Sequence, residues 1–255
     1  MYKSILPYIF FGVGLIIGSF LNVCIYRIPR GESILFPPSY CSCCGRRIKA
    51  RDLIPLLSYI RLKARCSFCG CSISPSHPIV ELFTGLLFTA AYLRFGTSTL
   101  LIKALFLISV FIVISFIDLE HFIIPDKIII FALSAGMVFV IFTREPAIAS
   151  ALAGSVSAVL FLLVLAFCSR GGMGGGDIKL AAVIGLCLGW PVGVIAVLLG
   201  CLLAGLVGLA LVLTKLKSRK DLLPFAPFLA AGTLIMFHSG SEILSWYFKN
   251  VLIID

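Results

Sequence analysis

Residues 99–126 read TLLIKALFLISVFIVISFIDLEHFIIPD, and this stretch contains the pattern that decides the fold. From Thr99 to Ile117 the side chains are apolar or small, with Lys103 as the single charge, and Asp118 stands where the run ends. A helix of about 20 predominantly apolar residues spans the hydrocarbon core of a bilayer. The stretch therefore predicts a transmembrane helix that ends at an acidic residue.

The composition extends this interpretation to the whole chain. Of the 255 residues, 60% are hydrophobic and only 13% are charged, whereas about a quarter of the residues in a soluble domain are charged. This balance excludes an ordinary soluble enzyme, a disordered chain and a disulfide-rich secreted domain. A polytopic membrane protein with one modest polar insert remains.

Eight apolar runs alternate with polar segments along the chain, so we expect an all-α polytopic membrane protein with about eight transmembrane helices. The second, fourth and sixth runs are short for a full span. The spacings Gly14/Gly18 and Gly185/Gly189 permit close packing between helices. The runs are Ile5–Tyr26, Ile79–Leu93, Thr99–Ile117, Lys127–Phe142, Ala147–Cys168, Ile178–Leu188, Val192–Leu213 and Phe228–Phe248.

The basic residues predict the orientation in the membrane. Sixteen of the 21 lysines and arginines lie in the segments 27–78, 118–127, 169–179 and 214–227. Because cytoplasmic loops are enriched in Lys and Arg, we expect these segments in the cytoplasm and both chain termini outside. The net charge of +10 then reflects membrane topology, and no nucleic-acid partner is expected.

This topology divides the chain into three parts. Residues 1–26 form the first transmembrane helix, residues 27–78 form a cytoplasmic insert, and residues 79–255 form a seven-helix membrane core. The partner that this topology implies is the lipid bilayer.

The insert contains a duplicated cysteine motif. Residues 41–48 and 66–73 match at C-S-x-C-G-x-x-I. Each Cys-x2-Cys turn can place two thiolates on one metal ion, so two turns supply the four sulfurs of a tetrahedral Zn²⁺ site. About 50 residues form only a small apolar core, and a metal would stabilise them. The predicted ligands are Cys41, Cys44, Cys66 and Cys69.

The insert has alternatives to this zinc site. The four cysteines could be reduced and unliganded. A disulfide in the insert is not expected, because the predicted topology places it in a reducing compartment. Cys43 and Cys71 occupy different positions in the two repeats, so we leave them out of the site. Four sulfur ligands leave no open position for water, which predicts a structural zinc rather than a catalytic one.

Acidic residues at the ends of apolar runs are the candidates for chemistry, because a carboxylate at membrane depth is costly. Asp118 ends the third run, and Asp177 follows a glycine-rich segment at 171–176. Asp126 follows Pro125 and is best read as a helix cap, an interpretation that is also open for Asp177. Two aspartates from different helices could share a proton, so that one acts as base toward water and the other as acid.

Taken together, the motifs resemble the bacterial type IV prepilin peptidase family, which are membrane aspartyl proteases of the Gly-x-Gly-Asp type. The resemblance covers about Gly18 to Leu229. Two positions differ from the usual family pattern, with Asp52 in place of Asn and Ala226 in place of Gly. The motifs are the paired Cys-x2-Cys turns and the segments 18–29, 52–59, 73–81, 174–179 and 224–229.

The resemblance implies a function and a site. The family's two catalytic aspartates fall on Asp118 and Asp177. The substrates would be type IV prepilins and pseudopilins, whose basic leader is cleaved at the cytoplasmic face of the inner membrane. Many members then methylate the new N-terminus with S-adenosylmethionine. The chain lacks a Rossmann-type strand–glycine loop–helix pattern, so residues that would bind this methyl donor are not assigned from the sequence.

Other functional classes fit the sequence less well. A metalloprotease would be expected to carry a motif such as His-Glu-x-x-His, and the chain has none. A transporter would place polar groups or broken helices near the bilayer midplane, whereas these acids lie at one face. A membrane scaffold whose zinc knuckles dock a partner is the remaining alternative. Cleavage of a prepilin would separate the peptidase from all three.

Overall fold

The structure is a computed structural model that describes residues 2–168, 173–218 and 221–250. All its regular elements in these residues are helices, which confirms the all-α prediction. The chain forms two compact units, Met1–Val113 and Ile114–Asp255, and helix α4 (Thr99–His121) continues from the first into the second.

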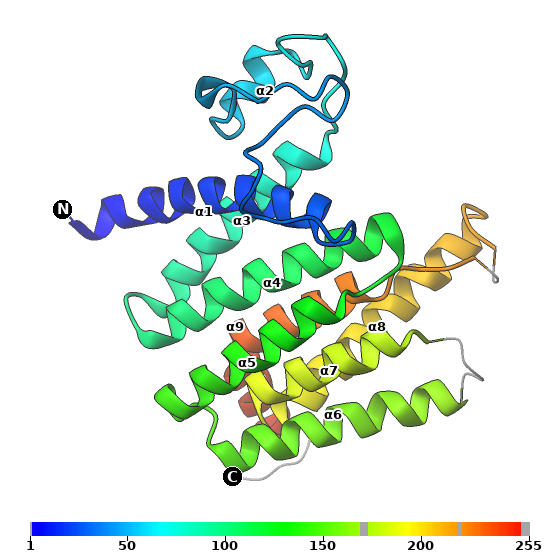
Figure 1. Ribbon diagram of the computed structural model, residues 1–255. Helices are drawn as coiled ribbons and strands as arrows, with labels where there is room; N and C mark the ends of the chain where they lie inside the picture. The colour runs from blue at the N-terminus through cyan, green and yellow to red at the C-terminus, as the bar shows by residue number, and fades with distance from the viewer. Residues whose placement is uncertain (1, 169–172, 219–220, 251–255) are drawn as a thin grey trace. The chain divides into compact units, whose positions relative to one another are not determined.

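The first unit consists of a helix pair and the insert (Figure 1). Helices α1 (Tyr2–Arg27) and α3 (Ser76–Phe95) pack against each other, and the insert between them contains η1 (Ala50–Asp52) and the short helix α2 (Leu57–Arg61). A Cβ atom on Gly14 would lie 2.7 Å from the Cα atom of Gly85. The predicted close packing at Gly14 and Gly18 is therefore confirmed, because only glycine leaves room for this approach.

The second unit packs its helices around one short central helix. After the end of α4 it contains α5 (Asp126–Thr143), α6 (Ile148–Cys168), α7 (Gly175–Leu188), α8 (Val192–Leu213) and α9 (Ala226–Asn250). Helix α7 contacts α5, α6, α8 and α9 (Figure 1). Its residues Leu180, Ala181, Val183 and Ile184 are fully buried. A helix that is apolar all round belongs in such an interior position.

Glycines set the distances between α7 and its neighbours. A Cβ atom on Gly154 of α6 would lie 2.6 Å from the carbonyl oxygen of Gly185, and one on Gly193 of α8 would lie 2.7 Å from the Cα atom of Gly185. Two helices thus touch the backbone of α7 at the same residue. The Ser155 hydroxyl also donates to the carbonyl of Ala182 at 3.1 Å, which adds a polar contact between α6 and α7.

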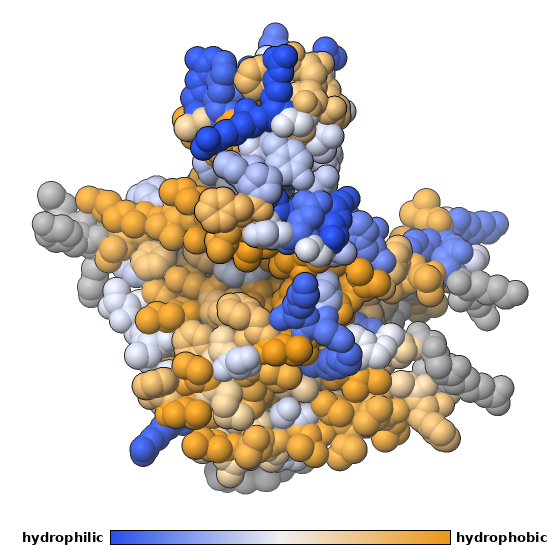
Figure 2. All heavy atoms as spheres, in the orientation of Figure 1, coloured by the Kyte–Doolittle hydropathy of each residue, from blue (hydrophilic) through white to orange (hydrophobic). Residues whose placement is uncertain are grey.

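All eight predicted runs correspond to helices, but fewer of these qualify as membrane spans. Among the described residues, six helices are long and apolar enough to cross a membrane, namely α1, α3, α4, α5, α6 and α8. Helix α7 has only 14 residues, about 21 Å of helix. In Figure 2 the helices carry mainly hydrophobic residues, whereas the insert carries hydrophilic residues beside hydrophobic ones. The chain is therefore a multi-pass membrane protein with a polar insert.

The glycine contacts predict a position-specific cost for adding a methyl group. Gly154→Ala places its Cβ atom against the backbone of α7, so we expect a loss of about 1–3 kcal/mol of stability. Gly205→Ala in α8 is the matched control, because no described atom lies within 4 Å of the position of its Cβ atom. Thermal unfolding in detergent should give a lower Tm for Gly154→Ala than for the wild type, and an unchanged Tm for Gly205→Ala. Equal Tm values would contradict the close contact.

Candidate active site and metal centre

The two cysteine repeats of the insert fold into the same tight turn. The Gly45 N–H donates to the Cys41 carbonyl at 2.8 Å, and the Gly70 N–H donates to the Cys66 carbonyl at 3.0 Å. Gly45 and Gly70 have φ angles of +68° and +70°, which glycine adopts without steric cost. The sequence repeat is therefore a structural repeat, and the glycine in each copy has a backbone reason.

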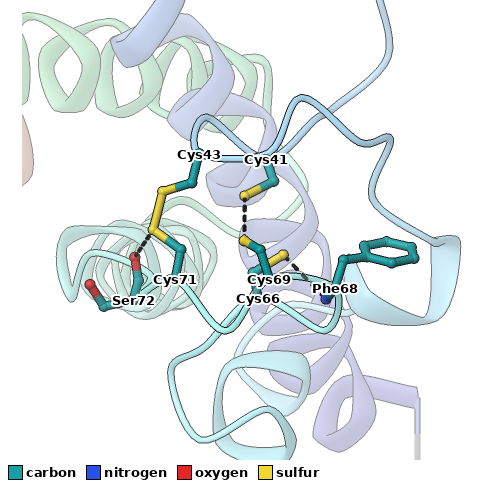
Figure 3. Close-up of a disulfide and its surroundings, with 7 residues drawn as sticks. All are labelled: Cys41, Cys43, Cys66, Phe68, Cys69, Cys71 and Ser72. Atoms are coloured by element: carbon teal, nitrogen blue, oxygen red, sulfur yellow. Dashed lines mark hydrogen bonds between the residues drawn. A yellow bond between two sulfur atoms is a disulfide. The ribbon is translucent and has the colours of Figure 1, made fainter.

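The repeats bring four thiols together. The Sγ atoms of Cys41, Cys44, Cys66 and Cys69 all lie within 4.8 Å of one another, and those of Cys41 and Cys69 are 3.9 Å apart (Figure 3). Zn–S bonds of about 2.3 Å in a tetrahedron place the sulfurs about 3.8 Å apart. The cluster therefore fits a tetrahedral metal ion.

The other two cysteines of the insert form a disulfide, so the expectation that the insert would contain none is wrong for this pair. Cys43 and Cys71 are joined, with Cα atoms 6.6 Å apart, as Figure 3 shows beside Cys41, Cys66 and Cys69. The reason is spatial. Each cysteine lies within one of the two knuckle turns, and the cluster brings these turns together. Cys43 and Cys71 are thus outside the four-thiol cluster, as the sequence predicted.

Buried carboxylates hold the insert together. The Asp52 carboxylate pairs with Arg61 at 2.5 Å and accepts a hydrogen bond from the Ser67 hydroxyl at 2.9 Å. The Glu81 carboxylate of α3 accepts the N–H of Leu56 at 2.8 Å. Glu81 thereby ties the insert to α3. Because its partner is 25 residues away in sequence, no local pattern indicated this role.

In the second unit, Asp118 lies one turn before the end of α4. Its side chain is buried, and its Oδ2 atom accepts the N–H of Ala226 at 2.9 Å. Ala226 is the first residue of α9, where the first N–H groups lack partners within the helix. The segment 224–229 therefore has a direct role at Asp118. The usual Gly at position 226 and the Ala found here both supply this N–H.

Asp177 lies in the first turn of α7, is buried, and interacts electrostatically with Asp118. The glycines before it permit this approach. A Cβ atom on Gly176 would lie 3.0 Å from the Cβ atom of Ile124, in the loop that follows α4. Gly176 thus lets the start of α7 lie against that loop. Gly171 and Gly172, which the sequence also singled out, are outside the described residues.

Asp126 begins α5, but the interpretation of its side chain as a helix cap is wrong. The N-cap position is occupied by Pro125. The Asp126 carboxylate instead pairs with Lys179 of α7, with 2.6 Å between Nζ and Oδ1. An ion pair across helices far apart in sequence competes here with the local capping interaction. Among the three acids, the structure therefore brings Asp118 and Asp177 together and engages Asp126 elsewhere.

Comparisons with known proteins identify the family. Residues 13–95 match the profile of the bacterial Peptidase A24 N-terminal domain, and residues 105–209 match that of the type IV leader peptidase family. The prepilin leader peptidase/N-methyltransferase of Bacillus subtilis is 40% identical over 244 residues, which cover 96% of this chain and 98% of that protein. The chain belongs to the type IV leader peptidase family.

More distant relatives support the same membership along the full chain. The prepilin leader peptidase/N-methyltransferase of Aeromonas hydrophila is 32% identical over 280 residues, covering 97% of both chains. That of Pseudomonas putida is 33% identical over 258 residues, covering 91% of this chain and 90% of the other. No solved structure matches. In a member of this family, the transporter and scaffold alternatives have no further support.

The four-thiol cluster predicts the metal content of this family member. We expect about one Zn²⁺ per chain in the purified protein, measured by elemental analysis. Cys41→Ser and Cys69→Ser should lose it, since each removes a sulfur of the cluster. Cys43→Ser and Cys71→Ser are matched controls and should keep it, because their sulfurs bind each other. Equal zinc in all four variants would contradict this ligand set.

The contact at Gly176 predicts an activity loss without a stability loss. Gly176→Ala brings its Cβ atom within 3.0 Å of Ile124, so the start of α7 and its aspartate must shift by a few tenths of an ångström. If Asp177 takes part in the reaction, a shift of this size should cost about tenfold in rate, while the added alanine favours the helix. Turnover should fall, and the double variant Gly176→Ala/Ile124→Gly, which removes the contacting Cβ atom of Ile124, should recover it. If turnover does not recover in the double variant, the contact with Ile124 is not the cause of the activity loss.

Proposed function

We propose that this chain is a membrane aspartyl endopeptidase that removes the basic leader from type IV prepilins and pseudopilins, and that it methylates the new N-terminus with S-adenosylmethionine. The observation that carries the proposal is that two buried aspartates, Asp118 and Asp177, from different helices of the second unit, lie near enough to interact electrostatically. The relatives over nearly the full chain carry both activities in their names.

The hydrolytic step follows from the chemistry of two neighbouring carboxyl groups. Close like charges favour a state in which the pair shares one proton. The ionised carboxylate takes a proton from water, which attacks the scissile carbonyl carbon, while the protonated partner donates to the carbonyl oxygen. The N–H of Ala226 holds one oxygen of Asp118, leaving the other for this exchange.

The membrane arrangement makes the site reachable by the substrate. We propose eight membrane helices, with α7 and α9 added to the six long apolar ones, and both termini outside. The bias of Lys and Arg toward one side supports this orientation. It would place the insert 27–78, Asp118 and Asp177 at the cytoplasmic face of the inner membrane. A prepilin inserted in the same bilayer would present its cleavage site at that depth.

Zinc at Cys41, Cys44, Cys66 and Cys69 would be structural. Four thiolates fill a tetrahedral ion and leave no position for water, and the insert is short, so the ion would stabilise it. The cluster and the aspartates also belong to different units of the chain. The metal would therefore support the insert rather than hydrolysis. Methylation with S-adenosylmethionine is inferred from membership of the family. We assign no residues to the binding of this methyl donor.

The aspartate pair is tested by removing one charge at a time. Asp118→Asn and Asp177→Asn should each lower cleavage by about three orders of magnitude or more, and the double variant should be no worse, because the residues act as a unit. Mass spectrometry of a prepilin measures the shortened product. Asp221→Asn is the matched control, an exposed acid whose carboxylate accepts the N–H of Ser218, three residues before it in the chain. Full activity in either single variant would refute the pair.

Chelation of zinc distinguishes the role of the insert from the role of the two aspartates. Removing zinc briefly should raise KM for the prepilin with little change in kcat, because the loosened insert weakens docking but not the aspartates. If methylation also depends on the insert, it should fail before cleavage does. A chelated but folded enzyme whose kcat for cleavage falls to background, and recovers only with zinc, would favour a metal-dependent mechanism instead.

A further inference from the structure

The ion pair between Lys179 and Asp126 has no role in the hydrolytic step above. The Nζ and Oδ1 atoms are 2.6 Å apart, which is a short charge-assisted hydrogen bond. Both side chains are about half exposed, at 53% for Lys179 and 64% for Asp126. The residues are 53 positions apart in sequence, so the contact reports tertiary structure rather than a local turn.

The pair connects the two segments that carry the aspartates. Asp126 follows Asp118 by eight residues, and Lys179 follows Asp177 by two. One continuous connection therefore joins the two aspartates. It runs along the chain from Asp118 to Asp126, across the ion pair to Lys179, and back through the first turn of α7 to Asp177. Any change in the register of α7 against the loop after α4 lengthens this path and moves Asp177.

A second contact joins the same two segments at positions nearer to the aspartates. Ile124, two residues before Asp126, lies against Gly176, one residue before Asp177. The apolar contact fixes the distance between the loop and α7. Apolar contacts are not directional, so this one does not define rotation about the axis of α7. A directional ion pair one helical turn beyond supplies the missing constraint.

We propose that Lys179 and Asp126 are positioning residues for prepilin cleavage: their ion pair sets the rotation and register of α7 and so orients Asp177 toward Asp118. The inference rests on the proposed peptidase function. Neither side chain touches the reacting atoms, and each acts through the aspartate near it in sequence. Because exposed ion pairs contribute modestly, each single loss should lower kcat about two- to fivefold.

The test is a double-mutant cycle with a charge swap, measured by prepilin cleavage in detergent. Asp126→Asn and Lys179→Met should each lower kcat about two- to fivefold with KM unchanged, and the double variant should be no worse than either. Lys179→Arg keeps the pair and should keep kcat. The swap Asp126→Lys/Lys179→Asp should recover kcat over the singles. Lys127→Met removes the neighbouring cation without touching the pair, and should behave as wild type.

Other outcomes would overturn the inference in distinct ways. Singles whose losses multiply in the double variant would show that the two residues act independently. A raised KM with unchanged kcat, confined to prepilins with a basic leader, would make Asp126 a substrate contact instead. Loss in Lys179→Arg equal to that in Lys179→Met would show that the ion pair is not the cause. Absence of cleavage by the wild-type protein would instead refute the proposed function.

Discussion

A carboxylate in a membrane interior needs hydrogen-bond donors from its own chain, since lipid supplies none. In this protein the N–H of Ala226 donates to Asp118, across 108 residues of sequence. The start of a helix is a suitable donor because its first N–H groups have no partners within the helix. Helix α9 therefore has to begin beside the end of α4, and this requirement orders the second unit.

The insert meets a different constraint, which is its small size. Its turns are closed by backbone hydrogen bonds at Gly45 and Gly70, and the cysteine cluster joins them. Buried polar contacts at Asp52 and Glu81 then connect the joined turns to neighbouring segments. The insert thus depends on sulfur and polar chemistry where the membrane helices depend on backbone packing.

Periodic and repeated features were predictable from the sequence, and long-range pairings were not. The apolar runs predicted all eight long helices, and the duplicated cysteine motif predicted the four-thiol cluster, because each signal lies within one segment. From the sequence we predicted Asp126 to be a helix cap, because its partner Lys179 comes close only through folding. The pairing of Cys43 with Cys71 was not predicted for the same reason. The bond from Ala226 to Asp118 was missed for the same reason, although segment 224–229 had already been singled out. The short α7 was visible as a short run, but its burial on all sides depends on four other helices.

The glycine contacts at Gly185 also determine how α7 can move. Backbone presses on backbone there from α6 and from α8, with no flexible side chain between them to absorb a displacement. Gly185 and Asp177 are eight residues apart on one continuous helix, about 12 Å along its axis. A push on the far end of α7 is therefore transmitted to the aspartate almost undiminished. A displacement of α6 or α8 at Gly185 would therefore move α7, and Asp177 with it.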